Sequence, residues 1–190
     1  MVIEIMRKLI MCLSAICTVC AIGIFVYSKS SNSLEHQVSV MQNQHIVLNF
    51  KHAKMMYKGI DSVYLPKQVP KLVVFIDSMS CSGCFMNSLL RYYEVNDSLI
   101  RRNASMLVIL HPPKTRIEEL KKRLDIERYP FWCILDKEGE FIKNNPNFTD
   151  NKLLHTFALD KNDNVILVGD PSTNPKIKQL LFNTIKQSQL

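Results

Sequence analysis

Residues 71–84 read KLVVFIDSMSCSGC, and this stretch decides how the rest of the chain is interpreted. Its first seven residues form a nearly continuous apolar run rich in Val and Phe, which predicts a central strand buried on both faces. Cys81 and Cys84 follow this strand, and apolar residues at helical spacing continue as far as Ile100. We therefore expect a buried strand, a turn and a helix that begins at Cys81.

The two cysteines are the candidate catalytic residues, with Cys81 as the nucleophile and Cys84 as the resolving thiol. A helix N-terminus offers unpaired backbone N–H groups and the positive end of the helix dipole, and both stabilise a thiolate. The pKa of Cys81 should therefore lie below that of a free thiol. Cys84, one turn further along the helix, can attack a mixed disulfide at Cys81.

Two other interpretations of the Cys81-Ser82-Gly83-Cys84 motif stay open. The pair could form a static structural disulfide, or it could be half of a zinc site. No second CxxC or CxxH occurs in the domain, so a tetrahedral zinc site lacks ligands, and neither a metal nor a cofactor is expected. The position of the motif between a buried strand and a helix favours a redox-active pair.

The chain around the motif alternates between strands and helices. Apolar runs predict the strands, and amphipathic spacing predicts the helices. Strands are expected at 45–50, 71–77, 105–111, 130–136, 155–160 and 165–170, with another near 63–65 in the ambiguous stretch 51–69, and helices are expected at 81–100, 115–127 and 175–185. This order predicts an α/β fold in which a parallel core carries an antiparallel edge.

The motif and two later stretches are similar to a known superfamily. KLVVFIDSMSCSGC resembles the active-site segment of the thioredoxin-like superfamily. RYPFWCILDKEGEF (128–141) and HTFALDKNDNVILVGDP (155–171) look like the tail of its redoxin branch, which includes peroxiredoxins and membrane-anchored TlpA-like thiol–disulfide oxidoreductases. The resemblance implies a thioredoxin-like fold, in which helices flank a central mixed sheet and Cys81 is exposed. It also implies protein thiols or disulfides as substrates and an upstream electron donor as a partner.

The resemblance is incomplete at three positions. Members of the superfamily usually carry a cis-proline before the strand that matches 155–160, and here residues 152–156 contain no proline. Phe75 stands where thioredoxins bury an acid, and Asn87 stands where many TlpA-like proteins carry a Glu. Substrate handling is therefore expected to differ, and proton transfer to Cys84 has no obvious inherited base.

Three titratable residues are candidates for that proton transfer. Parallel strands joined by a helix end at the same edge of a sheet, so His111 is expected near the end of the strand that leads to Asp77. Asp77 lies four residues before Cys81, and His155 lies where the cis-proline would be. Each residue also has an alternative without a catalytic role. His111 could be a solvent-facing loop histidine, Asp77 a polar residue that ends a strand, and His155 a structural histidine.

The N-terminal part of the chain predicts a membrane anchor. Residues 9–27, LIMCLSAICTVCAIGIFVY, carry no charge and are long enough to span a bilayer as a helix. Two basic residues precede the run, and the positive-inside rule then leaves residues 1–8 in the cytoplasm. An uncleaved anchor is expected, with a cleaved signal peptide as the alternative. The polar residues 28–44 are interpreted as a stalk, and residues 45–190 as the thioredoxin-like domain outside the cytoplasmic membrane, which is periplasmic in a Gram-negative cell.

The remaining composition excludes some partners. The net charge is +7, but the densest basic stretch, KTRIEELKKR, interleaves acids, so nucleic-acid binding is not expected. Cys133 lies in an apolar strand and is expected to be a buried free thiol. The chain is thus expected to be a membrane-tethered thiol–disulfide oxidoreductase. The alternative is a non-catalytic thioredoxin-like binding module with a structural disulfide. A thiol peroxidase is less favoured, because Val74 stands near the place of the upstream proline of that site.

Overall fold

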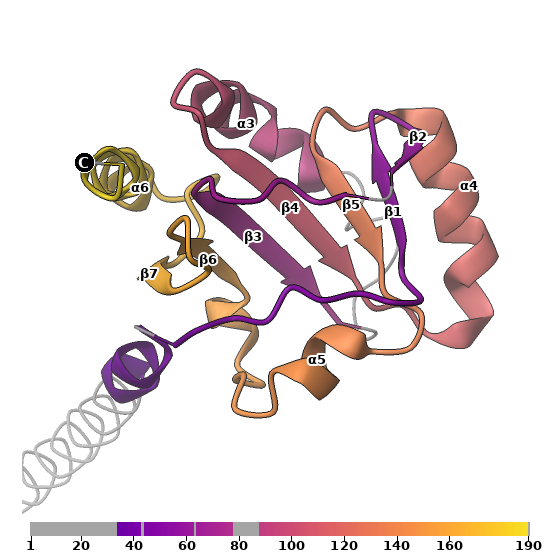
Figure 1. Ribbon diagram of the computed structural model, residues 1–190, viewed down its shortest axis with the longest axis horizontal. Helices are drawn as coiled ribbons and strands as arrows, with labels where there is room; N and C mark the ends of the chain where they lie inside the picture. The colour runs from indigo at the N-terminus through magenta and orange to yellow at the C-terminus, as the bar shows by residue number, and fades with distance from the viewer. Residues whose placement is uncertain (1–33, 43, 63, 78–87, 190) are drawn as a thin grey trace, which may run out of the picture. The chain divides into compact units, whose positions relative to one another are not determined.

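A seven-stranded mixed sheet forms the centre of the domain (Figure 1). The computed structural model describes residues 34–42, 44–62, 64–77 and 88–189. The chain divides into two compact units, Met1–Ser39 and Val40–Leu190, and the sheet belongs to the second unit. The second unit, described below, has the α/β class that the sequence predicts.

Little of the N-terminal unit falls within the described ranges. The predicted anchor at 9–27 lies outside them. Residues 34–41 are helical, although the predicted stalk at 28–44 shows no helical periodicity. None of the helices in the described part of the chain is long and apolar enough to cross a membrane.

The sheet combines a parallel core with antiparallel edges. Its strands lie in the order β2-β1-β5-β4-β3-β6-β7. Their bounds are β1 Lys54–Tyr57, β2 Ile60–Ser62, β3 Lys71–Ile76, β4 Ser105–Leu110, β5 Trp132–Leu135, β6 Thr156–Leu159 and β7 Val165–Val168. Strands β3, β4 and β5 are parallel, whereas β1 and β2 at one edge and β6 and β7 at the other pair antiparallel. The mixed sheet predicted from the order of apolar runs is therefore confirmed.

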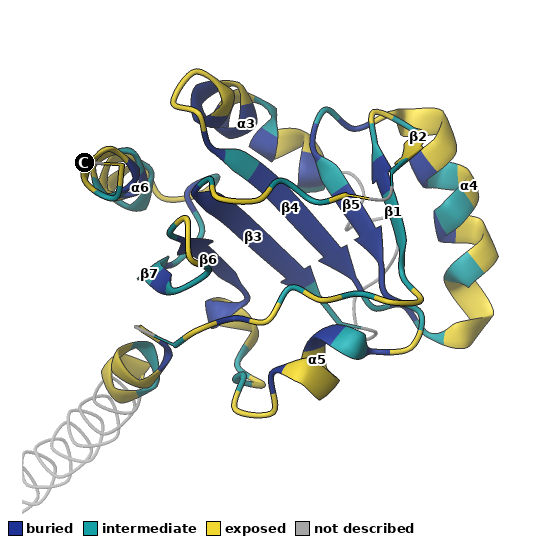
Figure 2. Cartoon of the chain, in the orientation of Figure 1, coloured by how far each residue is buried: buried dark blue, intermediate teal, exposed yellow. Residues whose placement is uncertain are grey.

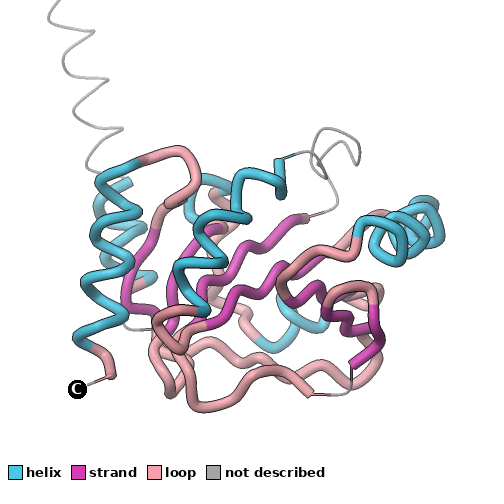
Figure 3. The backbone as a smooth tube through the Cα atoms, turned by 90° about the horizontal axis from the view of Figure 1, so that it is seen from above, coloured by secondary structure: helices cyan, strands magenta, loops and turns pink. Residues whose placement is uncertain are grey.

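Three longer helices cover one face of this sheet, as Figure 3 shows. The helical segments are η1 Leu90–Tyr92, α3 Tyr93–Ile100, η2 Lys114–Arg116, α4 Ile117–Glu127, α5 Glu140–Asn144, η3 Lys152–Leu154 and α6 Pro175–Gln187. Side chains alternate along a strand, so Val74 and Val108 pack toward α3, α4 and α6 in the main hydrophobic core. The central strands are buried along almost their whole length (Figure 2).

Aromatic side chains fill the opposite face of the sheet. Phe75 of β3 lies 4.8 Å from Phe141 of α5, measured between ring centroids, and 5.6 Å from Phe148. Phe148 also packs against Phe157 of β6, at 5.5 Å. Offset and edge-on aromatic contacts at these distances add to the stabilisation from burial. This aromatic cluster joins the loop after α5 to the two strands that border the candidate site.

The strong periodic signals are confirmed. The apolar runs at 71–77, 105–111 and 130–136 contain β3, β4 and β5, and the predicted hairpin is β6 and β7. Helix α6 begins with Pro175 at its first position, as expected. The side chain of Asn174 caps this helix, because its Oδ1 accepts hydrogen bonds from the backbone N–H groups of Lys176 and Ile177.

The strand predicted at 45–50 is wrong. This segment makes one isolated bridge, between His45 and Asn164, and is otherwise irregular. The side chain of Asn145 takes the place of a neighbouring strand: its Oδ1 accepts from Val47 N–H, and its Nδ2 donates to the Val47 carbonyl. The backbone groups are satisfied without a strand partner, so an apolar run need not become a strand.

Two further elements were not predicted at their observed places. Strands β1 and β2 form a hairpin earlier than the strand expected near 63–65, and Val63 itself lies outside the described residues. The hairpin turn is Lys58-Gly59, with φ of 53° and 75°. Positive φ at both turn positions fits the twist of a two-residue hairpin, and glycine adopts it readily. The short helix α5 follows β5, where the sequence predicts only the end of a strand.

Candidate functional site

A pocket of about 180 Å³ opens at the carboxyl end of β3. The end of β3, the chain around η1 and the start of β6 contribute its walls, which consist of Val74, Phe75, Ile76, Asp77, Ser88, Arg91, Tyr92, Lys152, His155 and Thr156. Asp77 and Ser88 are the described residues on either side of residues 78–87 in the chain. The two described residues that border 78–87 in the chain therefore both contribute to this pocket.

The predicted nucleophile Cys81 and the resolving residue Cys84 both lie outside the described residues. The described wall carries two cations, Arg91 and Lys152, and one acid, Asp77. Lys152 Nζ lies 3.3 Å from Asp77 Oδ1, and both side chains are partly exposed, so solvent screens their attraction. With part of the Lys152 charge offset by Asp77, the wall keeps a positive balance through Arg91, which favours a bound anion.

Of the three residues predicted for proton transfer, Asp77 and His155 line this pocket and His111 does not. The strand ends do meet, because the backbone N–H of His111 donates to the Ile76 carbonyl at 2.8 Å. The His111 ring, however, lies against Gly139, and its Nδ1 is 2.8 Å from the Asp136 carbonyl oxygen. The strand topology is as expected, whereas the His111 side chain forms its hydrogen bond at the end of β5 and not in the pocket.

Asp136 is a buried acid that the sequence did not point to. Its carboxylate is fully buried at the end of β5 and accepts hydrogen bonds from the backbone N–H groups of Glu140 and Phe141. These bonds satisfy unpaired donors at the start of α5. Asp136 therefore holds the turn against which His111 packs. It carries a structural role here.

His155 lines the pocket from the first turn before β6. Its ring lies 5.1 Å from Phe75 and 5.4 Å from Phe148, between centroids, and its Nε2 is 2.9 Å from the Thr149 carbonyl oxygen. Burial lowers the pKa of His155, and the Thr149 bond and the Asp77 charge oppose this shift. The ring is therefore held as a neutral imidazole, and its bond to a carbonyl oxygen places the proton on Nε2.

The backbone beside His155 differs from the pattern that the resemblance implied. Residues Lys152–Leu154 form a 3-10 turn, capped by the Asn151 side chain, which accepts from Leu153 N–H. No cis peptide bond occurs among the described residues. The carbonyl of His155 accepts a 2.8 Å hydrogen bond from Phe75 N–H, so this turn leads directly into the pairing of β6 with β3.

Tyr92 and its partners form a part of the site that sequence reasoning missed. Burial raises the pKa of Tyr92 to about 12, and the nearby charge of Asp170 adds to the shift. Its hydroxyl is also within hydrogen-bonding reach of Thr156 and Ser172. Ser172 Oγ in turn donates to Asp170 Oδ1 at 2.7 Å. These residues are far apart in the sequence, so no local motif indicates that they meet.

Cys133 is buried, as predicted. It is a free thiol in β5 with 3% of its surface exposed, and burial raises its pKa to about 12. A thiol that is neither ionised nor accessible does not exchange disulfides. Cys133 therefore acts as a small apolar residue of the core.

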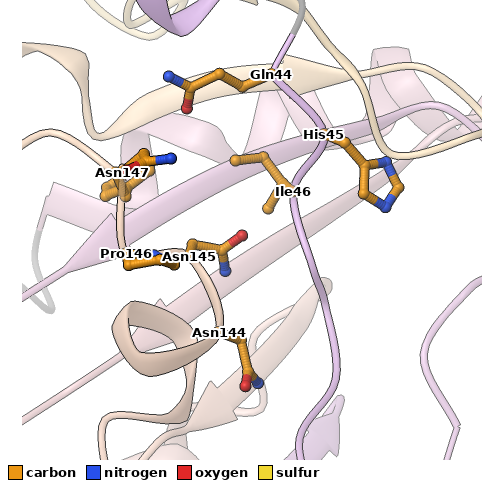
Figure 4. A pocket seen from close by; sticks show the side chains of 8 residues that line it. Gln44, His45, Ile46, Asn144, Asn145, Pro146 and Asn147 are labelled. Carbon is orange, nitrogen blue, oxygen red and sulfur yellow. The ribbon is translucent and has the colours of Figure 1, made fainter.

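A second pocket, of about 230 Å³, lies between residues 44–46 and 144–148 (Figure 4). Its lining is rich in amides, from Gln44, Asn144, Asn145 and Asn147. Asn145 is already used, because it bonds Val47 through both amide atoms and donates to the Phe141 carbonyl. His45 is the only ionisable residue in the described lining of this pocket, and Asn145, which bonds the backbone, has a structural role. In the described ranges no cluster of His, Cys, Asp or Glu side chains could hold a metal ion.

Comparisons with known proteins identify the fold. No family model and no curated protein sequence matches the chain. Among solved structures, a reduced 2-Cys peroxiredoxin from Plasmodium vivax is similar with a TM-score of 0.53 and 14% identity, over 78% of this chain and 98% of that one. A thioredoxin-like protein in the oxidised form matches at 0.51 and 11% identity, over 77% and 97% of the two chains. An uncharacterised thioredoxin-like protein from Porphyromonas gingivalis matches at 0.50 and 14% identity, over 77% and 95%. The fold is therefore thioredoxin-like.

Proposed function

We propose that this chain is a thiol–disulfide oxidoreductase that exchanges disulfides through Cys81 and Cys84. One observation carries the proposal: Asp77 and Ser88, which flank residues 78–87, line the same pocket in a thioredoxin-like fold. Each cysteine lies only four residues from one of these flanking residues. Four residues span at most about 14 Å, and this limit on chain length supports the proposal that both thiols act at this pocket.

In the proposed reaction, the Cys81 thiolate attacks one sulfur of a protein disulfide, and the substrate's second sulfur leaves as a thiolate. The Cys84 thiolate then attacks Cys81 Sγ, which breaks the mixed disulfide and releases the substrate's other thiolate. The substrate gains two electrons and two protons, and Cys81 and Cys84 become a disulfide. An upstream protein dithiol, as electron donor, returns the pair to its reduced form. The same steps in reverse oxidise a substrate.

The described wall of the pocket supports the first of these steps. The Arg91 guanidinium lines the pocket and bonds to the Ser88 carbonyl, which keeps a permanent positive charge beside the flank of the cysteine segment. A cation near a thiol lowers its pKa and raises the thiolate fraction. Asp77 acts in the opposite direction, and its ion pair with Lys152 reduces that effect. His155, held neutral, is the described group best suited to accept a proton within this pocket.

Trapping of mixed disulfides tests the proposal. Cys84→Ser keeps the attacking thiol and removes the resolving one, so this variant should accumulate substrates covalently bound to Cys81. Cys81→Ser is the matched control and should trap little. The measurement is a non-reducing gel of both variants of the full chain, expressed at equal level in membranes. If neither variant accumulates reducible adducts, the exchange mechanism is wrong.

A non-catalytic binding module is the second candidate. It is favoured by the absence of a proline in residues 152–156 and by the Lys152–Asp77 ion pair at the pocket. In that case Cys81 and Cys84 form a static disulfide. A reduction potential near that of thioredoxin supports exchange, whereas a value of about −300 mV or lower identifies a structural bridge.

We also propose that residues 9–27 anchor the chain in the cytoplasmic membrane, with the thioredoxin-like domain outside the cytoplasm. The uncharged run and the basic residues before it support this topology. An exported domain would meet an oxidising compartment, where protein disulfides persist and a reductase has substrates.

A further inference from the structure

A basic pocket lies between two helices, away from the candidate redox site. It has a volume of about 430 Å³ and is formed by the C-terminal ends of α3 and α6, which run along the same face of the sheet (Figure 3). Its cations are Arg101, Arg102 and Lys186. The pocket belongs to neither the thiol chemistry nor the aromatic cluster, so its charge needs a separate explanation.

The cations of this pocket have no acidic partner among the described residues. None of Arg101, Arg102 and Lys186 forms an ion pair with a carboxylate in that part of the chain, and the rest of the described lining is neutral. Three positive groups around one concave site repel one another. An anion that enters the pocket relieves this repulsion and replaces screening by water.

The fold holds the Arg102 guanidinium in place. Its carbon Cζ lies 4.3 Å from the centroid of the Phe182 ring, and one of its N–H groups donates to the Ser98 carbonyl at 2.8 Å. The Phe182 ring packs against the guanidinium, whereas the N–H donors that do not bond Ser98 stay available. A planar fork held in this way matches two oxygens of a phosphate group.

Capping of α3 explains only part of this arrangement. Arg101 donates to Ser98 Oγ and Arg102 to the Ser98 carbonyl, and cations near a helix C-terminus are favourable in themselves. However, the Gln189 amide already donates to the Arg102 carbonyl at 2.7 Å, and each guanidinium uses only one of its five N–H donors on Ser98. The unused donors and Lys186 exceed what the helix end requires.

We propose that this pocket binds a phosphate group. Three cations fit a group of two negative charges better than a single carboxylate, and Arg102 supplies the bidentate donor. The volume is within the range of small-ligand sites and exceeds what inorganic phosphate alone would fill. Phe182 offers an apolar wall to the organic part of the ligand. The phosphate could belong to a soluble phosphorylated compound or to the headgroup of an anionic lipid.

The test is a titration of the ¹⁵N-labelled full chain, held in nonionic detergent micelles, with inorganic phosphate at constant ionic strength. Saturable shifts of the amides of residues 101–103 and 182–189 are expected. The variant Arg101→Gln with Lys186→Gln should lose at least about tenfold in affinity, because two of three charges are removed. The control Lys122→Gln with Lys176→Gln removes the same charge from exposed lysines of α4 and α6 and should stay within about twofold.

A second arm distinguishes the two sources of the phosphate group. Glycerol phosphate is added in solution, or phosphatidic acid is added to the micelles at the same total phosphate concentration. Shifts at 101–103 and 182–189 from the lipid alone assign the pocket to a headgroup, and shifts from the soluble compound alone assign it to a soluble ligand. Non-saturable shifts, or equal loss in both double variants, would overturn the proposal.

Discussion

His155 is a base that the fold keeps uncharged beside an acid. The residue is 7% exposed, and its ring lies between two phenylalanines and bonds the Thr149 carbonyl through Nε2. Because the proton is on Nε2, the other ring nitrogen, Nδ1, holds the free lone pair. The nearby charge of Asp77 favours protonation, but burial outweighs it and lowers the pKa.

The stability of the protein should fall with acidity through His155. The folded pKa lies below the unfolded value of about 6.5, so the unfolded state takes up the proton first. The stabilisation is complete above pH 6.5 and is lost as the pH falls toward the folded pKa. Between pH 7.5 and 5.5 the native chain should lose up to about 1 kcal/mol more than His155→Gln.

The measurement is urea unfolding of the full chain in nonionic detergent, followed by the fluorescence of Trp132, the only tryptophan. His52→Gln serves as the control, because this exposed histidine pairs with Glu140 at the surface. An equal pH dependence in the native chain and in His155→Gln would contradict the assignment.

Three cysteines of the domain should differ in reactivity. At mildly acidic pH the reduced chain should be alkylated about tenfold faster at Cys81 than at Cys84, because the helix start that the sequence predicts at Cys81 favours its thiolate. Cys133 should stay unlabelled while the protein is folded, since burial raises its pKa to about 12. Peptide mapping after a timed reaction measures all three. Faster labelling at Cys84 or at Cys133 would overturn the assignment of the nucleophile.

Residues of the described pocket wall could be predicted where the order of the chain places them beside the motif, or, as for His155, where the resemblance points to them. Asp77 could be predicted from its place at the end of the strand before the motif, and it does line the pocket. His111 was placed correctly at the edge of the sheet, but its ring direction depends on the Asp136 carbonyl and on Gly139. Tyr92 and Asp170 approach each other through tertiary packing, which no local spacing records.

At the scale of the element, helix α6 depends on the residue before it. Asn174 satisfies two of the N–H groups at the start of the helix. Asn174→Ala should therefore lower the free energy of unfolding by about 1 kcal/mol. Gln179→Ala, at an exposed position of the same helix, should change it by no more than a few tenths of a kcal/mol. Urea unfolding of both variants decides the matter, and equal midpoints would remove the capping role.

Elements with a strong local apolar pattern were predicted correctly from the sequence. Segments whose conformation depends on side chains from distant parts of the chain were not. After their first residues, strands β3 and β4 are continuous apolar runs of the length that a buried sheet position accommodates. Residues 45–50 also contain apolar residues, but the side chain of Asn145 bonds the backbone of Val47 where a neighbouring strand would otherwise do so. Helix α5 has five residues, too few for a helical period to show.

At the scale of the whole molecule, the topology of the chain in the membrane is a separate prediction. A reporter that is active only outside the cytoplasm, fused after the last residue, should be active, because residues 9–27 are uncharged and Arg7 and Lys8 precede them. Replacement of both basic residues by glutamate should lower that activity severalfold. A full-length product that fractionates with soluble cytoplasmic proteins would contradict the anchor.

The hydrogen bond between Phe75 N–H and the His155 carbonyl makes two walls of the candidate-site pocket neighbours at the pairing of β3 with β6. A length change in the turn Lys152–Leu154 would shift the register of β6 and turn its side chains to the wrong face. Point substitutions at Lys152 or Arg91 leave that pairing intact. Single substitutions in the pocket wall can therefore change what the pocket binds without disturbing the sheet. Insertions and deletions in this turn would disrupt the pairing, so both evolution and protein engineering are restricted to substitutions here.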